Sequence, residues 1–69
     1  MKENREAISR AAELLAYKLR AGEISKDGGD IIYQVILHNP DKVDSIIDIM
    51  DMDLLEAETI ARIKSLQSI

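Results

Sequence analysis

The sequence contains no cysteine and only one histidine, His38, among its 69 residues. Without cysteine the chain can form neither a disulfide nor a thiolate metal site, and a single histidine excludes any zinc site that uses two. Chains of this length bury a small core and usually need a disulfide, a metal or a partner subunit for stability. Because the composition leaves only the partner subunit, we expect the chain to form a homodimer.

Glycine and proline are also scarce, and no apolar run approaches the roughly 20 residues that a membrane-spanning helix needs. Apolar residues make up 46% and charged residues 32% of the chain, which indicates a globular protein rather than a disordered one. Residues 1–6 are mostly charged and lead into no long apolar run, so we expect neither a signal peptide nor a membrane segment. We therefore predict a single cytoplasmic domain over residues 1–69.

The segment 30–38 is the most apolar part of the chain. Six of the seven residues from Ile31 to Leu37 are apolar or aromatic, and only Gln34 interrupts them. On a helix these side chains point in nearly every direction, and a helix that is apolar all round must be enclosed on most sides. Its β-branched residues make a strand the competing prediction, but no other segment offers a strand partner. We therefore predict a central core helix from about Gly28 to His38.

Three further helices enclose this segment in the predicted fold, over about residues 3–21, 40–50 and 53–67. Gly22 supplies the left-handed residue that ends the first helix, and Lys26-Asp27-Gly28-Gly29 is the strongest turn signal in the chain. The predicted amino-terminal caps are Asn4, Asp27, Asn39 and Asp53, the last with Glu56 as the acid of a capping box. We thus expect an all-α fold, a small four-helix orthogonal bundle.

Apolar residues at helical spacing predict which sides of the surrounding helices face the core. In the first and third helices these residues are Ile8, Ala12, Leu15 and Leu19, and Val43, Ile46, Ile47 and Met50. In the last helix the apolar residues recur every three positions, so they spiral around the axis and cannot all face one neighbour. We expect Leu54, Ala57 and Ala61 to face the core and Ile63, Leu66 and Ile69 to face elsewhere.

Either the terminal turn of this last helix is frayed, or a second chain covers the apolar surface that the spiral leaves, and we expect the second chain. We predict that the homodimer interface consists of Leu14, Tyr17, Ile63, Leu66 and Ile69. Full burial of a large apolar side chain contributes roughly 1.5–3 kcal/mol, which is substantial for so small a core. For Leu14 and Tyr17, which lie nearly opposite the core side of the first helix, ordinary exposed apolar surface is the alternative interpretation.

The sequence shows no pattern typical of catalysis, metal binding or cofactor binding. His38 ends a helix just before a proline, where it interacts with the helix dipole, and no serine or threonine lies in a nucleophile motif. A calcium loop beginning at Asp51 needs an oxygen ligand and then a glycine where the sequence has Leu55 and Glu56. The Gly28-Gly29 pair lacks the lysine and hydroxyl of a phosphate loop. We therefore predict a protein that is not an enzyme and uses no cofactor or metal.

The net charge of −4 is unevenly distributed along the chain. Residues 1–26 contain six bases and four acids, whereas residues 27–69 contain nine acids and three bases. Nucleic-acid binding needs a clustered cationic surface, so this distribution makes nucleic acid an unfavourable partner. A helix-turn-helix built around Asn39-Pro40 would press aspartates against phosphates. The remaining alternative is a nucleic-acid-associated regulator that contacts phosphates through Arg5, Arg10, Lys18 and Arg20 of the first helix.

Four aspartates gather on one side of the predicted third helix, at spacings of three, four and three. We call Asp41, Asp44, Asp48 and Asp51 the acidic face. Close carboxylates cost a few tenths of a kcal/mol per pair. The simpler interpretation is a solvated surface that keeps a small apolar protein soluble. The functional interpretation is a docking surface for a protein with a basic or apolar surface. We therefore predict a protein–protein interaction module, a small regulator or inhibitor.

Overall fold

The computed structural model describes residues 2–67, with side chains described from Arg5 onward, and this part of the chain is helical without any strand. Its elements are α1 (Lys2–Arg20), α2 (Lys26–His38), the short 3-10 helix η1 (Pro40–Lys42), α3 (Val43–Asp51) and α4 (Glu56–Leu66). The all-α prediction and the number of α-helices are confirmed. None of the described helices is both long enough and apolar enough to cross a membrane.

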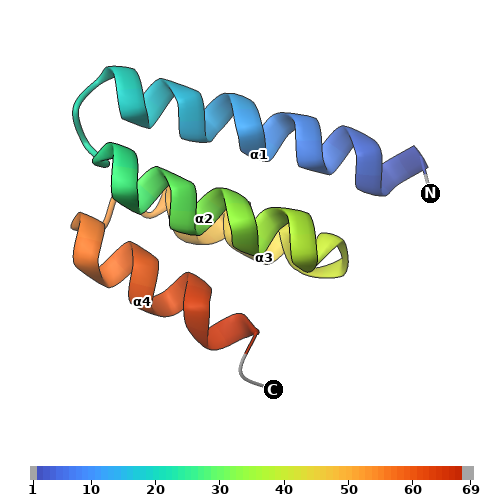
Figure 1. Cartoon of the computed structure of the whole chain (residues 1–69). Helices are drawn as coiled ribbons and strands as arrows, with labels where there is room; N and C mark the ends of the chain where they lie inside the picture. The colour runs from blue at the N-terminus through green and yellow to red at the C-terminus, as the bar shows by residue number, and fades with distance from the viewer. Residues whose placement is uncertain (1, 68–69) are drawn as a thin grey trace.

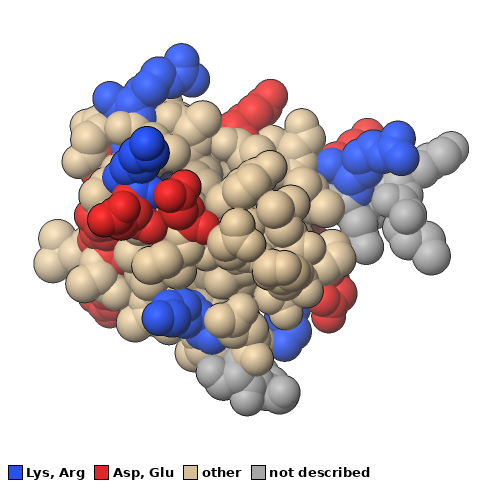
Figure 2. Space-filling view, in the orientation of Figure 1, with Lys and Arg blue, Asp and Glu red and all other residues tan. Residues whose placement is uncertain are grey.

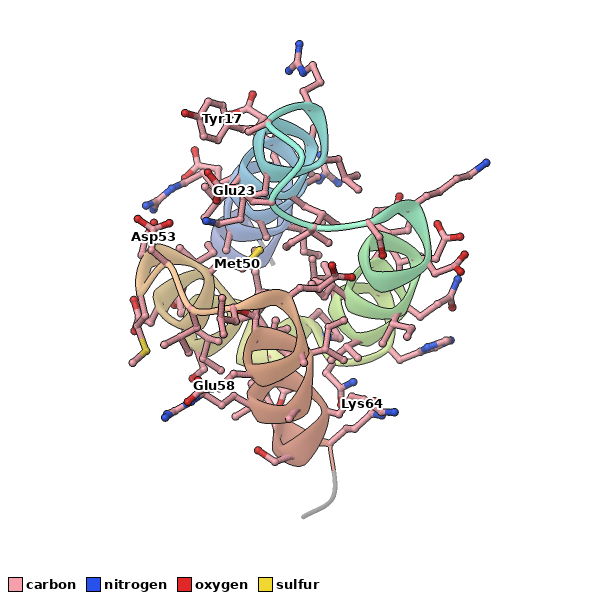
Figure 3. The ribbon with its side chains drawn as sticks, turned by 90° about the vertical axis from the view of Figure 1, so that its left-hand side faces the viewer. Tyr17, Glu23, Met50, Asp53, Glu58 and Lys64 are labelled. Atoms are coloured by element: carbon pink, nitrogen blue, oxygen red, sulfur yellow. The ribbon has the colours of Figure 1, made fainter. Side chains whose placement is uncertain are left out.

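The four helices form a bundle in which α2 lies between α1 and α4, with α3 behind it (Figure 1). α1 packs on α2 and α3, and α4 packs on α2 and α3. The helices run roughly alongside one another in two perpendicular views, which differs from the orthogonal arrangement that the sequence suggests (Figures 1 and 3). The consecutive pairs α1–α2 and α3–α4 pack against each other, as short connections favour, whereas α2 and α3 lie on opposite sides of the core (Figure 3).

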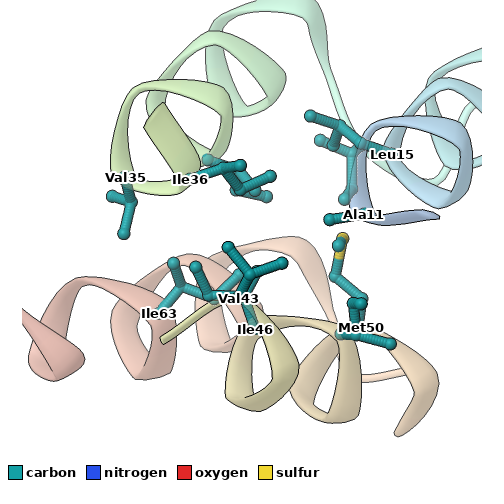
Figure 4. Packing of buried hydrophobic residues seen from close by; sticks show 11 residues of the cluster. Ala11, Leu15, Val35, Ile36, Val43, Ile46, Met50 and Ile63 are labelled. Atoms are coloured by element: carbon teal, nitrogen blue, oxygen red, sulfur yellow. The ribbon is translucent and has the colours of Figure 1, made fainter. Parts of the chain in front are cut away.

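The core lies where the inner sides of all four helices meet (Figure 4). Its buried apolar residues are Ala11, Leu15, Ile24, Ile32, Val35, Ile36, Val43, Ile46, Ile47, Met50 and Ile63. The four residues of α3 in this set are those that the helical spacing predicts. In α1 the prediction is correct only in part, since Leu15 is buried and Leu19 is partly exposed.

The carboxyl end of α1 forms as predicted, whereas its beginning does not. Gly22 has a φ of 78°, in the left-handed region that favours glycine. The N–H of Glu23 donates to the carbonyl of Lys18 and the N–H of Gly22 to that of Leu19, which is a Schellman ending. Asn4 lies inside the helix rather than at its cap, because α1 already begins at Lys2.

α2 begins earlier than the sequence suggests, because its cap is Ser25 and not Asp27. The Ser25 hydroxyl accepts a hydrogen bond from the N–H of Gly28. Gly28 and Gly29 are therefore inside the helix, where both are buried. A Cβ on Gly29 would lie 2.8 Å from Cδ2 of Leu19 in α1, and one on Gly28 would lie 3.0 Å from Cδ1 of Ile60 in α4. The two glycines lie at close helix–helix contacts rather than in a turn.

The prediction that α2 is enclosed on most sides is wrong. Ile32, Val35 and Ile36 are buried. On the other sides of the helix, Ile31, Tyr33 and Leu37 are 38%, 43% and 47% exposed. The neighbouring helices cover one side of α2 and leave the remainder open, so part of the apolar surface of this helix remains exposed.

The connection between α2 and α3 reverses the predicted role of Asn39. Its side-chain Nδ2 and its backbone N–H both donate to the carbonyl of Val35, so Asn39 ends α2. It makes no capping hydrogen bond to the following element, which is the 3-10 turn η1 with Pro40 in its first position.

The predicted capping box at the start of α4 is also wrong. Asp53 has a φ of 56° and its carboxylate pairs with Lys18 of α1, so it is not at a helix cap. α4 starts at Glu56 with Leu55 at the cap position, where no side chain caps the helix. The hydroxyl of Thr59 instead donates to the carbonyl of Leu54.

The two sides of α4 are exchanged relative to the prediction. Thr59 and Ile63 are buried, and Ile60 and Leu66 are partly buried against the core. The residues expected to face inward are exposed or only half-buried; these are Leu54, Ala57 and Ala61. Leaving two alanines in water costs less than exposing isoleucine, so the larger residues occupy the core side. Ile69 lies outside the described residues.

Candidate functional site

The acidic face is present as a surface on η1 and α3. Asp41 lies in η1, Asp44, Asp48 and Asp51 lie in α3, and all four are exposed. The α3 members are spaced by four and three residues, which keeps them on one side of a helix. The hydrogen bonds and salt bridges between described side chains involve none of these four carboxylates. The face therefore presents unneutralised negative charge to solvent.

The one base inside this stretch does not neutralise it. Lys42 donates a hydrogen bond through Nζ to the backbone carbonyl of Leu66, at the carboxyl end of α4. A cation at that position stabilises the negative end of the helix dipole. At the other end of the face, Asp51 borders a groove of about 350 Å³ between α1 and α3, also lined by Arg10, Glu13, Leu14 and Ile47.

A second charged group, which the sequence prediction missed, lies at the end of the bundle. The ammonium of Lys18 is 3.1 Å from Oε1 of Glu23 and 2.9 Å from Oδ1 of Asp53. The Lys18 residue is 6% exposed, while both carboxylates remain accessible. Its place on the same side of α1 as Ala11 and Leu15 is the signal that could have indicated its burial.

Two opposing effects act on the charge of Lys18. Burial lowers its pKa, but the hydrogen bonds to Asp53 and Glu23 and the charges of both carboxylates outweigh burial, so the pKa is raised above its ordinary value of 10.5. Lys18 is also one of the bases of the alternative phosphate-contacting surface. Because its ammonium is enclosed and already paired, it is unavailable for that role.

An open hollow lies beside this ion-paired group. We call it the end hollow; it has a volume of about 370 Å³ and is lined by Glu23, Asp53, Leu54, Leu55 and Glu56. Figure 3 looks onto this end of the bundle and shows Glu23 between Tyr17 and Asp53 in that view. Leu55, one of the lining residues, is 81% exposed. Acidic and apolar groups therefore occur together at this end.

The residues predicted for the dimer interface do not form one surface. Leu14 is half-buried against the core and Tyr17 is exposed, both on α1. Ile63 is fully buried within the chain and Leu66 partly so, both on α4, while Ile69 lies outside the described residues. α1 and α4 lie on opposite sides of α2 (Figure 1). Assigning Ile63 to an interface with a second chain is therefore wrong, because a neighbouring helix already covers it.

The largest uncharged area in Figure 2 covers the carboxyl-terminal half of α2. The exposed side chains of α2 that contribute apolar surface are Ile31, Tyr33 and Leu37. Tyr33 and Leu37 are four residues apart and share one side of α2, and we call them the α2 apolar face, whereas Ile31 lies on the opposite flank of the buried residues. The apolar run from Ile31 to Leu37, interrupted only by Gln34, is the signal from which such a face could have been anticipated, because a small domain covers only part of its apolar surface.

Within residues 2–67, the acidic side chains and His38 form no group of three that could hold a metal ion. The chain matches no known protein family, no curated protein and no solved structure.

Proposed function

We propose that the chain is a non-enzymatic protein-interaction module, a small regulator or inhibitor that docks its acidic face on a basic surface of a partner protein. The observation that carries this proposal is the set of four exposed aspartates on η1 and α3, to which no cation among the described side chains is paired. Like charges held close together reduce stability slightly, and a basic partner would remove that repulsion on binding.

The electrostatics of such a surface determine how it would bind. Opposite charges on the two partners accelerate their encounter, and added salt screens that attraction over about 8–10 Å at physiological ionic strength. Binding should therefore weaken as the salt concentration rises, mainly through a slower association rate.

The test compares two double variants that change the net charge equally. One is Asp44→Lys with Asp48→Lys, on the acidic face; the control is Glu6→Lys with Asp30→Lys, on α1 and α2, where both residues are also exposed. Each variant, immobilised, is used for quantitative affinity capture from a lysate of the native host. We expect a protein that the wild type and the control retain and that the acidic-face variant loses.

Two results would contradict this proposal. Equal loss in both variants would mean that only net charge matters, and full retention by the acidic-face variant would mean that binding uses another surface. Thermal unfolding of both variants should remain close to that of the wild type, because surface substitutions at unpaired positions change stability little.

We also propose that the chain forms a homodimer, and that the α2 apolar face is the surface through which it does so. Tyr33 and Leu37, two large side chains that are partly exposed and four residues apart on one side of α2, support this location. A core of this size gains much from covering such a surface. Sedimentation velocity over a range of concentrations tests the proposal, with Leu37→Glu expected to shift the protein to monomer and Leu55→Glu as the exposed control. A wild type that stays monomeric throughout would refute it.

A further inference from the structure

The end hollow lies between two chain segments that the ion pairs of Lys18 hold together. One is the connection between α1 and α2, which includes Glu23, and the other is the connection between α3 and α4, which includes Asp53. The Lys18 ammonium bonds to both, and the Ser25 hydroxyl donates to Oε2 of Glu56 at 2.6 Å, which joins the same two connections a second time. The walls of the hollow are thus fixed before any ligand arrives, which lowers the entropic cost of binding.

The hollow carries excess negative charge. Glu23, Asp53 and Glu56 contribute three carboxylates, and Lys18 supplies one ammonium, so two negative charges remain. Each carboxylate has two oxygens and about four acceptor positions, of which the known hydrogen bonds use only a part. A cationic donor placed in the hollow would therefore find free acceptors from more than one residue.

Leu55 adds an apolar contact at the edge of this charged hollow. It is 81% exposed and occupies the cap position of α4, where serine, threonine, aspartate or asparagine would stabilise the helix by accepting a backbone hydrogen bond. Leucine at this position contributes neither burial nor a capping hydrogen bond. A residue that is poor for stability on a fixed, exposed turn is typical of a contact surface.

We propose that the end hollow receives an arginine side chain that is followed or preceded by an apolar residue in a segment of a partner protein. The planar guanidinium can donate to two carboxylates at once, which a lysine ammonium does less well. The aliphatic part of the arginine lies against Leu54 and Leu55, and the neighbouring apolar residue covers the exposed part of Leu55. This inference rests on the proposed function only in assuming a protein partner with basic residues; it uses a different surface from the acidic face.

The experiment is a nuclear magnetic resonance titration of the full chain with two short peptides. The first is N-acetyl-Leu-Arg-Leu-amide, and the second has citrulline in place of arginine, which keeps the shape and removes the charge. We expect saturable shifts at the backbone amides of residues 23 and 53–56 with the arginine peptide, and much smaller shifts with the citrulline peptide. Shifts of equal size with both peptides, or none with either, would overturn the proposal.

Three variants distinguish this inference from the proposed function. Leu55→Ser removes the apolar contact while supplying a helix cap, so we expect about tenfold weaker peptide binding together with unchanged or higher stability. Glu23→Gln should also weaken binding, since it removes one carboxylate of the hollow. Asp44→Lys with Asp48→Lys should leave the peptide affinity within about twofold of the wild type. If the acidic-face variant alone abolishes binding, the hollow is not the site and the acidic face is.

Discussion

Nζ of Lys18 lies 2.9 Å from Oδ1 of Asp53, a residue 35 positions later in the chain. The contact joins the last turns of α1 to the connection between α3 and α4 and is present although burial disfavours the charged ammonium. Asp53 tolerates its left-handed backbone better than most residues, since aspartate is enriched there. The same lysine also bonds to Glu23, so one ammonium determines the position of both connections at this end.

Stability at alkaline pH should depend on Lys18. Its pKa is raised in the folded chain above the ordinary value of 10.5, so folding favours the protonated form. The resulting stabilisation is complete below the pKa of the unfolded chain and is lost as the pH rises through the higher folded pKa. We expect the gap in urea midpoint between the wild type and Lys18→Met to be constant from about pH 8 to 9.5 and to shrink above about pH 10.5. Both proteins contain the same tyrosines, so the effect of tyrosine titration cancels in the difference between their urea midpoints. A difference that stays constant above about pH 10.5 would contradict the expectation.

Replacement of Ser25 tests the assignment of the α2 cap. Ser25→Ala removes both the bond from the N–H of Gly28 and the bond to Glu56, so we expect a loss of about 1–2 kcal/mol in the free energy of unfolding. Asp27→Ala should cost only a few tenths of a kcal/mol, because Asp27 lies in the first turn of α2, where an acidic side chain interacts favourably with the helix dipole. Urea denaturation measures the loss in the free energy of unfolding for each variant. A larger loss for Asp27→Ala than for Ser25→Ala would show that Asp27 is the cap.

The two buried glycines of α2 should respond differently to alanine. At Gly29 the obstructing atom belongs to Leu19, which is partly exposed and can turn aside, so the gain in helix propensity should leave stability unchanged or up to about 1 kcal/mol higher. At Gly28 the obstruction is the Glu56 carboxylate, which is bonded to Ser25, together with Ile60. We expect Gly28→Ala to cost about 1 kcal/mol, as the lost hydrogen bond would suggest.

A double-mutant cycle provides the control for this difference. In a Glu56→Ala background the cost of Gly28→Ala should fall to near zero, since the obstructing carboxylate is gone. Equal effects at both glycines, or an unchanged cost in the Glu56→Ala background, would show that close packing does not explain them.

Truncation of Ile63 separates a core role from an interface role. Ile63→Ala should cost about 2–5 kcal/mol, because the side chain is fully buried and its removal leaves a cavity. A domain of this size has roughly 5 kcal/mol to lose, so the variant should be largely unfolded by circular dichroism at room temperature. Ile31→Ala, at a partly exposed position, should cost less than about 1 kcal/mol. If the Ile63→Ala variant were folded but monomeric, the result would contradict a core role and support the assignment of Ile63 to the dimer interface.

The fold class and the buried side of α3 could both be predicted from the sequence, because helical periodicity shows which side of an amphipathic helix is apolar. Val43, Ile46, Ile47 and Met50 are buried as that periodicity predicts. The acidic face was predictable for the same reason, since three of its residues share one side of a regular helix.

The remaining errors come from contacts between segments that are distant in the sequence. Nothing local to Gly28 and Gly29 distinguishes a turn from a helix that two neighbours approach closely, and only the positions of Leu19 and Ile60 decide it. The role of Asp53 depends in the same way on Lys18. The end hollow could not be predicted because the two connections that form it meet only in the folded chain.

The burial of Lys18 gives this protein a natural chemical reporter. Amine-directed acylation requires an accessible, deprotonated nitrogen, and Lys18 has neither access nor a lowered pKa in the folded chain. An exposed lysine such as Lys26 reacts without any structural change. The ratio of the Lys18 labelling rate to the Lys26 labelling rate would therefore measure how often the α1–α2 and α3–α4 connections separate by local opening. The measurement needs no substitution in the chain.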